Sequence, residues 1–139
     1  MPEPIQLQQL AFETEAEMIG SRDVPALVET VEENERDFPN WTYLTLLNSK
    51  GRIIGAVRYK QNENIVEVGR LMIHPDYRRR GLAQLLMTEV DKVCSNYVRE
   101  LYTCTKSWSN IKLYEKLGYA AFKEVKEKNG LSFLYMRKG

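Results

Sequence analysis

The segment from Val68 to Cys104 constrains the fold more than any other part of the sequence. The strand-like run "VGRLMI" ends at a "HP" turn and is followed by "RRGLAQLLMTEVDKVCSN" and then by "VRELYTC". The middle run is predicted to be a helix, because its apolar residues recur at helical spacing; they are Leu82, Leu85, Leu86, Val90 and Val93. A strand, a helix and a strand in this order predict a βαβ-like unit.

Alternating apolar and polar residues predict further strands on both sides of this unit. The run "PIQLQQLAF" at 4–12 suits a first strand, and helical stretches follow at 13–19 and from Asp23 onward. The run at 41–75 then predicts three strands. Turn residues at Asn48–Gly51 and Asn62–Asn64 separate these strands, which favours an antiparallel meander.

The C-terminal part predicts one short helix and a hairpin. The run "SWSNIKLYEKLG" suits a helix capped by Ser107 or Ser109 and ended by Gly118. The strands "YAAFKEV" and "LSFLYMR" flank an Asn-Gly pair, which is a strong hairpin signal. We therefore expect a single α+β domain over residues 1–139, with a mixed, mostly antiparallel sheet and flanking helices.

Composition excludes several classes of protein. The net charge is +1 and the pI is about 7.7, so a general affinity for nucleic acid is not expected. One histidine and two cysteines, Cys94 and Cys104, predict neither a metal site nor a disulfide framework. No apolar run approaches the roughly 20 residues of a membrane span, and the N-terminus lacks a signal pattern. A cytoplasmic protein is the expectation.

The loop "RRRGLA" at 78–83 is the clearest candidate site. The first turn of a helix has backbone N–H groups without internal partners, and its dipole favours an anion. Gly81 lets a ligand approach the backbone, and arginine suits phosphate oxygens. This combination fits a pyrophosphate better than a nucleic-acid duplex, which needs a wide basic face. A solvated turn with a tight bend at Gly81 is the alternative.

Two motifs resemble the GNAT family of N-acetyltransferases. In "VGRLMIHPDYRRRGLAQLLM", the family's Q/R-x-x-G-x-G/A motif reads Arg78, Arg79, Arg80, Gly81, Leu82 and Ala83. Downstream, "SWSNIKLYEKLGYAAFKE" is similar to the second motif, which ends in L-Y-E-K-x-G-F/Y. The expected order of elements also matches this family over nearly the whole chain, though the first forty residues match only in coarse pattern.

The resemblance implies acetyl-CoA as cosubstrate. It implies that Arg78 marks the motif and that the pyrophosphate is held by backbone amides of Arg79, Arg80, Gly81, Leu82, Ala83 and Gln84. The strand residues Leu71, Met72 and Ile73 would pair with the pantetheine arm as an added strand does. That strand would separate from the one at 98–103 and leave a wedge for the arm.

The resemblance also implies catalytic residues. Tyr114 stands where the family has a tyrosine acid, and Glu67 is the candidate base. Packing of Tyr114 against the sheet and simple exposure of Glu67 are the alternatives. Strand alternation places Glu67, Gly69, Leu71 and Ile73 on one face unless a bulge intervenes. A backbone N–H near Met72 or Ile73 would stabilise the oxyanion.

One position departs from the family pattern. Ser107 stands where an asparagine is usual, seven residues before the tyrosine, and Asn110 follows three residues later. Either residue is a candidate for the pantetheine contact.

We therefore expect an N-acetyltransferase that moves the acetyl group of acetyl-CoA directly to a primary amine. The acceptor is a small molecule or a peptide, with no metal, nucleic acid or membrane involved. A CoA-binding sensor or subunit without turnover is the first alternative, and a nucleic-acid binder that uses Arg78–Arg80 is the second. The acceptor's identity and a homodimer are left open.

Overall fold

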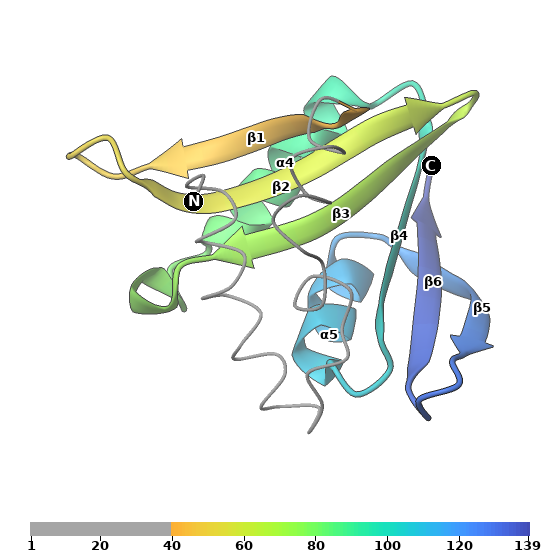
Figure 1. The fold of residues 1–139 in the computed structure, drawn as a ribbon. Coiled ribbons are helices and arrows are strands. Elements are labelled where there is room, and N and C mark those ends of the chain that lie inside the picture. Colours follow the sequence, from red (N-terminus) through yellow and green to blue (C-terminus); the bar gives the residue numbers. More distant parts are fainter. Residues whose placement is uncertain (1–39) are drawn as a thin grey trace.

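The structure of the chain, a computed structural model, describes residues 40–139 (Figure 1). The strand expected at 4–12 and the helices expected at 13–19 and after Asp23 lie outside the described residues. Six strands form one sheet in the order β1-β2-β3-β4-β6-β5, and all neighbouring pairs are antiparallel except β3 and β4. The expected mixed, mostly antiparallel sheet is therefore confirmed over this part of the chain.

The elements follow the expected order. The strands are β1 (Thr42–Leu47), β2 (Ile53–Asn62), β3 (Ile65–Ile73), β4 (Val98–Cys104), β5 (Ala120–Lys126) and β6 (Ser132–Lys138). The helices are α4 (Leu82–Val93) and α5 (Trp108–Lys116), with a 3-10 turn, η2, at Pro75–Tyr77. The predicted meander and C-terminal hairpin are both present. The Asn-Gly pair lies in a longer connection between β5 and β6, in which Gly130 adopts a φ of 88°.

Helix α4 covers one face of the meander, but not with the whole predicted stripe. Leu86 and Val90 are buried as expected, together with Met87. Leu85 and Val93 are 46% and 54% exposed, so their assignment to the buried stripe is wrong. The sheet accepts only the narrow helix face centred on Leu86 and Val90, and a count of apolar residues at helical spacing overstates its width.

Strand β3 contains a bulge that changes which side chains share a face. Ala56 of β2 pairs with Met72, but Arg58 pairs with Gly69, so β3 holds one extra residue near Arg70, whose φ is 50°. Such a bulge reverses the alternation of side chains beyond it. The face expected to hold Glu67, Gly69, Leu71 and Ile73 together is therefore split.

The core clusters show the split directly. Val66, Val68, Leu71 and Ile73 all pack in the cluster that contains α4, whereas Met72 packs with Ala56 in a separate cluster. Glu67 precedes the bulge and belongs to the face away from α4, because it alternates with Val66 and Val68.

Strands β3 and β4 are paired over a short length only. Their parallel pairing joins Ile65 to Val98, Val66 to Arg99 and Glu67 to Glu100, and it stops there. Figure 1 shows the two strands starting side by side near the C-terminus and diverging, with α5 near the far end of β4. The predicted separation of these strands is confirmed.

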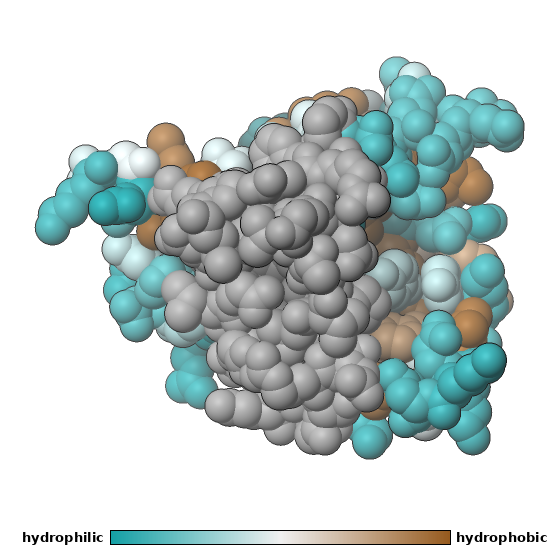
Figure 2. All heavy atoms as spheres, in the orientation of Figure 1, coloured by the Kyte–Doolittle hydropathy of each residue, from teal (hydrophilic) through white to brown (hydrophobic). Residues whose placement is uncertain are grey.

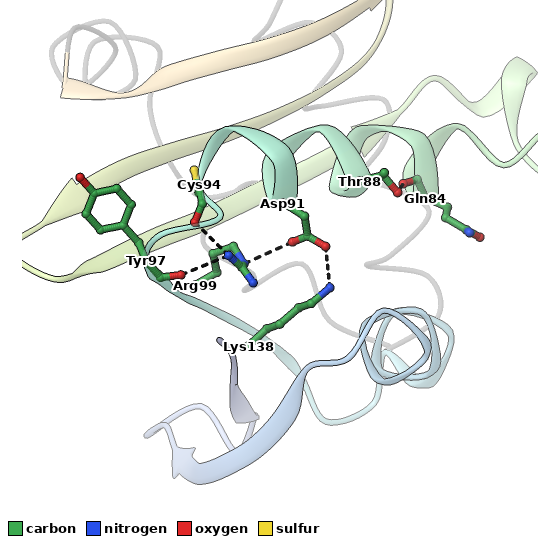
Figure 3. A network of polar contacts seen from close by, with 7 residues as sticks. All are labelled: Gln84, Thr88, Asp91, Cys94, Tyr97, Arg99 and Lys138. Carbon is green, nitrogen blue, oxygen red and sulfur yellow. Dashed lines mark hydrogen bonds and ion pairs between the residues drawn. The ribbon is translucent and has the colours of Figure 1, made fainter.

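A polar network stabilises the end at which β3 and β4 are paired, which we call the closed end (Figure 3). The Arg99 guanidinium donates to the carbonyl oxygens of Cys94 and Tyr97 and lies 3.2 Å from the Asp91 carboxylate. Lys138 of β6 binds the same carboxylate. Asp91 therefore links α4 to two strands at the end of the sheet where β3 and β4 meet.

Two further observations concern the described residues as a whole. Within 40–139, no helix combines the length and the apolar character that a membrane span requires. Over the same residues, no group of three or more His, Cys, Asp or Glu side chains is arranged to hold a metal ion. Cys94 and Cys104 are both buried free thiols.

Candidate functional site

The loop before α4 exposes backbone N–H groups at a helix N-terminus. Arg79 and Gly81 both have left-handed backbones, with φ of 63° and 74°. The first bond of the helix runs from the Leu85 N–H to the Gly81 carbonyl, so the N–H groups of the three preceding residues lie before this ladder. Left-handed turns at a helix N-terminus form anion-binding concavities.

Gly81 leaves room for a ligand at this loop. A Cβ placed on Gly81 meets no atom within 4 Å, so the space beside its backbone is open. No side chain caps the N-terminus of α4, because Gly81 occupies the capping position. The loop therefore fits the pyrophosphate-binding role that the sequence predicts.

A groove of about 420 Å³ runs from this loop to α5. The sequence-predicted residues that line it are Leu71, Ile73, Arg78, Arg79, Gly81, Leu82, Ala83, Gln84 and Asn110. Arg80 does not line the groove, and its guanidinium lies 5.1 Å from the ring centroid of Tyr77. Its contribution to the site would come from its backbone.

A second cavity of about 280 Å³ lies between β3 and β4, and we call it the wedge. Leu71 and Asn110 line both this wedge and the groove, so the two are neighbours. The wedge brings together both predicted catalytic residues, Glu67 and Tyr114. Its remaining lining comes from Trp41, Arg58, Val68, Gly69, Arg70, Glu100, Leu101, Tyr102, Thr103, Cys104, Phe133 and Tyr135.

The C-terminus of α5 positions Tyr114. Gly118 adopts a φ of 100°, its N–H donates to Glu115, and the N–H of Tyr119 donates to the Tyr114 carbonyl. These two bonds form a Schellman motif, which fixes the last turn of the helix. The rings of Tyr114 and Tyr119 lie edge to face, with centroids 6.0 Å apart. Tyr114 is 7% exposed, so its ring is both packed and part of the wedge.

Ser107 and Asn110 are placed differently. Ser107 is 1% exposed, precedes α5 as its N-cap residue, and lines neither cavity. Asn110 lies one turn into α5 and lines both cavities. Met72 likewise lines neither cavity, because its side chain is buried on the face opposite α4.

The backbone of β3 offers hydrogen-bonding groups to the separated side. The His74 N–H donates to the Ile54 carbonyl of the neighbouring segment at 2.8 Å. Because every second residue of an antiparallel pair makes such bonds, Met72 also turns its backbone towards β2, where it pairs with Ala56. The backbone groups of Leu71 and Ile73 are therefore directed to the edge that β4 has left.

Glu67 lies at the closed end of the wedge. Its carboxylate accepts a hydrogen bond from the Asn62 side chain at 2.8 Å, and its partner in the parallel pairing is Glu100. Tyr135 lies nearby, and its pKa is raised above the ordinary value of 10.0. Burial is the main cause, and the charges of Glu100 and Glu67 add to it, so this phenol is neutral at physiological pH.

One wall of the wedge is formed by residues that the sequence did not single out. Glu100 and Tyr102 come from β4, and Phe133 and Tyr135 come from β6. Alternating side chains in β4 and β6 indicated that these residues share one face of each strand. The two strands are neighbours because β6 lies between β4 and β5, and this order places Tyr102 opposite Tyr135.

The family follows from a comparison with known proteins. A family model described as "Acetyltransferase (GNAT) domain" matches residues 16–139. The chain belongs to the GNAT acetyltransferase family.

Individual relatives of this GNAT chain are distant. It is 28% identical over 130 residues to the UPF0157 protein YqkA of Bacillus subtilis, covering 93% of this chain and 37% of that protein. It is 33% identical over 79 residues to the N-terminal acetyltransferase B complex catalytic subunit NAA20 of Arabidopsis thaliana, covering 54% of this chain and 45% of that protein. The chain thus spans less than half the length of these relatives.

A solved structure supports the fold. An aminoglycoside 6'-N-acetyltransferase complexed with coenzyme A matches with a TM-score of 0.68 at 17% identity, over 97% of this chain and 89% of that one. At this identity the likeness establishes the shared GNAT fold alone.

Proposed function

We propose that this chain transfers the acetyl group of acetyl-CoA directly to a primary amine. The observation that carries the proposal is the arrangement of two neighbouring cavities. One starts at the exposed N–H groups of α4, which suit a pyrophosphate, and the other holds Tyr114 and Glu67. Leu71 and Asn110 line both, so a long, thin molecule bound along the groove would bring its end into the wedge.

The loop and β3 would hold the cosubstrate. Backbone N–H groups from Arg79 to Gln84 would bind the pyrophosphate, with the side chains of Arg78 and Arg79 at the groove wall. Leu71 and Ile73 would pair with the amide groups of the pantetheine arm. Asn110, rather than Ser107, would add a side-chain contact, because Asn110 lines the groove and Ser107 does not.

Three groups would serve the reaction itself. Glu67 would accept a proton from the incoming ammonium, directly or through one water, because only a neutral amine attacks the thioester. The Ile73 N–H, which faces the separated side, would stabilise the oxyanion. The Tyr114 hydroxyl would donate a hydrogen bond to the leaving thiolate, a contribution that for general acids is typically about 10²–10⁴-fold in rate.

Two variants test the assignment. Gly81→Glu should abolish the thermal shift caused by acetyl-CoA, because it fills the open space at the loop with a like-charged group. Gly130→Glu is the matched control, since Gly130 also has a left-handed backbone and open space around it but lies in the β5–β6 connection. Equal loss of acetyl-CoA binding in both variants would contradict the cosubstrate site.

Tyr114→Phe tests the chemical step. We expect thiol release from acetyl-CoA with an amine to fall about 100-fold in kcat, within the range for a lost general acid. The thermal shift with acetyl-CoA should persist. Unchanged turnover would remove Tyr114 from the mechanism while leaving the binding site intact. A thermal shift without thiol release for any amine would instead identify a CoA-binding module.

A further inference from the structure

A row of four charged residues crosses the sheet at the closed end of the wedge, where β3 and β4 are paired. Lys60 of β2 is paired with Glu67 of β3, Glu67 with Glu100 of β4, and Glu100 with Arg137 of β6. Directly paired residues present their side chains on the same face of a sheet. The row therefore places two carboxylates side by side between two cations.

The two carboxylates are not equally compensated. Arg137 donates to Glu100 through both Nε and Nη2 at 2.9 Å, and both contacts fall on the same oxygen, Oε2. Glu67 accepts from the neutral amide of Asn62 through Oε1. Neighbouring like charges are unfavourable on a sheet. The Lys60 ammonium lies over the Trp41 ring, 4.6 Å from its centroid, and not on Glu67. Oε1 of Glu100 and Oε2 of Glu67 are therefore left to receive hydrogen bonds from a bound ammonium.

An aromatic wall stands next to these carboxylates. Tyr102, two residues after Glu100 on β4, is the register partner of Tyr135, two residues before Arg137 on β6. Their rings are stacked with centroids 5.3 Å apart, and Phe133 lies edge-on to Tyr102 at 5.7 Å. Tyr102 is 47% exposed, so part of its ring is open to a ligand. Figure 2 shows apolar atoms reaching the surface between hydrophilic ones on the β5–β6 side of the molecule.

Cations border this wall on both sides. The Lys123 ammonium lies 4.6 Å from the centroid of the Tyr135 ring. Across the wedge, the Arg58 guanidinium lies 3.8 Å from the centroid of the Trp41 ring. A ligand that carries a second ammonium a few bonds from the first would bring it towards these cations, and this repulsion disfavours a polyamine.

We propose that the acceptor is a monocationic primary amine with an apolar, ring-sized body, and that Glu100 and Tyr102 determine this specificity. Glu100 and Glu67 receive the ammonium, and the Tyr102–Tyr135 stack packs against the body. The inference rests on the proposed transfer to an amine and names the acceptor class.

The experiment compares amines at saturating acetyl-CoA. Thiol release should give a kcat/KM for 2-phenylethylamine at least tenfold above the values for 1,4-diaminobutane and glucosamine. Glu100→Gln should raise the KM for 2-phenylethylamine about tenfold with a smaller change in kcat. Tyr102→Ala should lower the preference for 2-phenylethylamine over n-butylamine about tenfold. Glu124→Gln, an exposed carboxylate of β5 that does not line the wedge, is the control.

Two results would overturn the proposal. One is a preference for the diamine or the aminosugar, and the other is an amine preference that Tyr102→Ala leaves unchanged. Absence of thiol release with every amine would instead contradict the transfer reaction. In that case calorimetry with 2-phenylethylamine in the presence of CoA tests whether the wedge binds this amine. Binding weakened by Glu100→Gln and Tyr102→Ala supports the proposal, and no binding overturns it.

Discussion

The two ends of strand β4 have opposite characters. At its N-terminal end β4 pairs with β3, and Arg99 lies in a buried network with Asp91 of α4 (Figure 3). At its C-terminal end β4 has left β3, and Tyr102 and Cys104 line a cavity. The same strand therefore closes the sheet at one end and opens it at the other.

The difference lies in how polar groups find partners. At the closed end, Arg99 is 7% exposed and binds two carbonyl oxygens as well as a carboxylate, so its buried charge is compensated within the protein. At the open end, the edge groups of Leu71 and Ile73 and the ring of Tyr102 face the groove and the wedge. We infer that the closed end carries stability and that the open end carries binding, and three changes test this division.

The largest effect is expected at the closed end. Asp91→Ala should lower the free energy of unfolding by about 3 kcal/mol, because it leaves the Arg99 guanidinium buried without its carboxylate. Denaturant unfolding measures this loss. Glu89→Gln, which removes an exposed pair with Lys92, should cost less than about 0.5 kcal/mol. If both variants lose the same free energy of unfolding, the Asp91–Arg99 network does not stabilise the closed end more than a surface ion pair does.

A smaller effect is expected where the groove meets the wedge. Asn110→Ala should raise the KM for acetyl-CoA about tenfold, equivalent to about 1.4 kcal/mol, with an unchanged melting temperature. Ser107→Ala should leave the KM for acetyl-CoA unchanged and lower the free energy of unfolding by about 1 kcal/mol, because the Ser107 hydroxyl is buried away from both cavities. If Ser107→Ala raises the KM for acetyl-CoA and Asn110→Ala does not, Ser107 and not Asn110 contacts the pantetheine arm.

The smallest effect at neutral pH is expected at Tyr119. Burial, and then the negative charge of Asp91, raise the pKa of this tyrosine above its ordinary value of 10.0. The native state therefore keeps the phenol proton at a pH where the unfolded chain releases it, and stability should fall as pH rises above 10. Tyr119→Phe should make that decline shallower and should leave the pH dependence of stability between pH 7 and 9 unchanged. Denaturant unfolding of both proteins at pH 8 and pH 11 measures the decline, and equal declines would show that Tyr119 is not its source.

Local chemistry made much of this architecture predictable. The strand boundaries followed from alternation and turn residues, and Gly118 marked the end of α5 because only a left-handed residue completes that cap. The loop at 78–83 was a candidate site because a glycine and arginines at a helix start suit an anion. Leu85 and Val93 were misassigned, because helical spacing does not tell how wide a face the sheet will bury.

The sequence by itself predicted the elements of residues 40–139 and a candidate phosphate-binding loop, and its family resemblance named Tyr114 and Glu67 as candidate catalytic residues. The tertiary structure decided which side chains meet. The extra residue near Arg70 separates the face of Glu67 from that of Leu71, and β6 lies between β4 and β5. The aromatic wall of the wedge, with Glu100 beside it, exists only through these pairings. Residues far apart in the sequence become neighbours through sheet register, and no local pattern encodes that register.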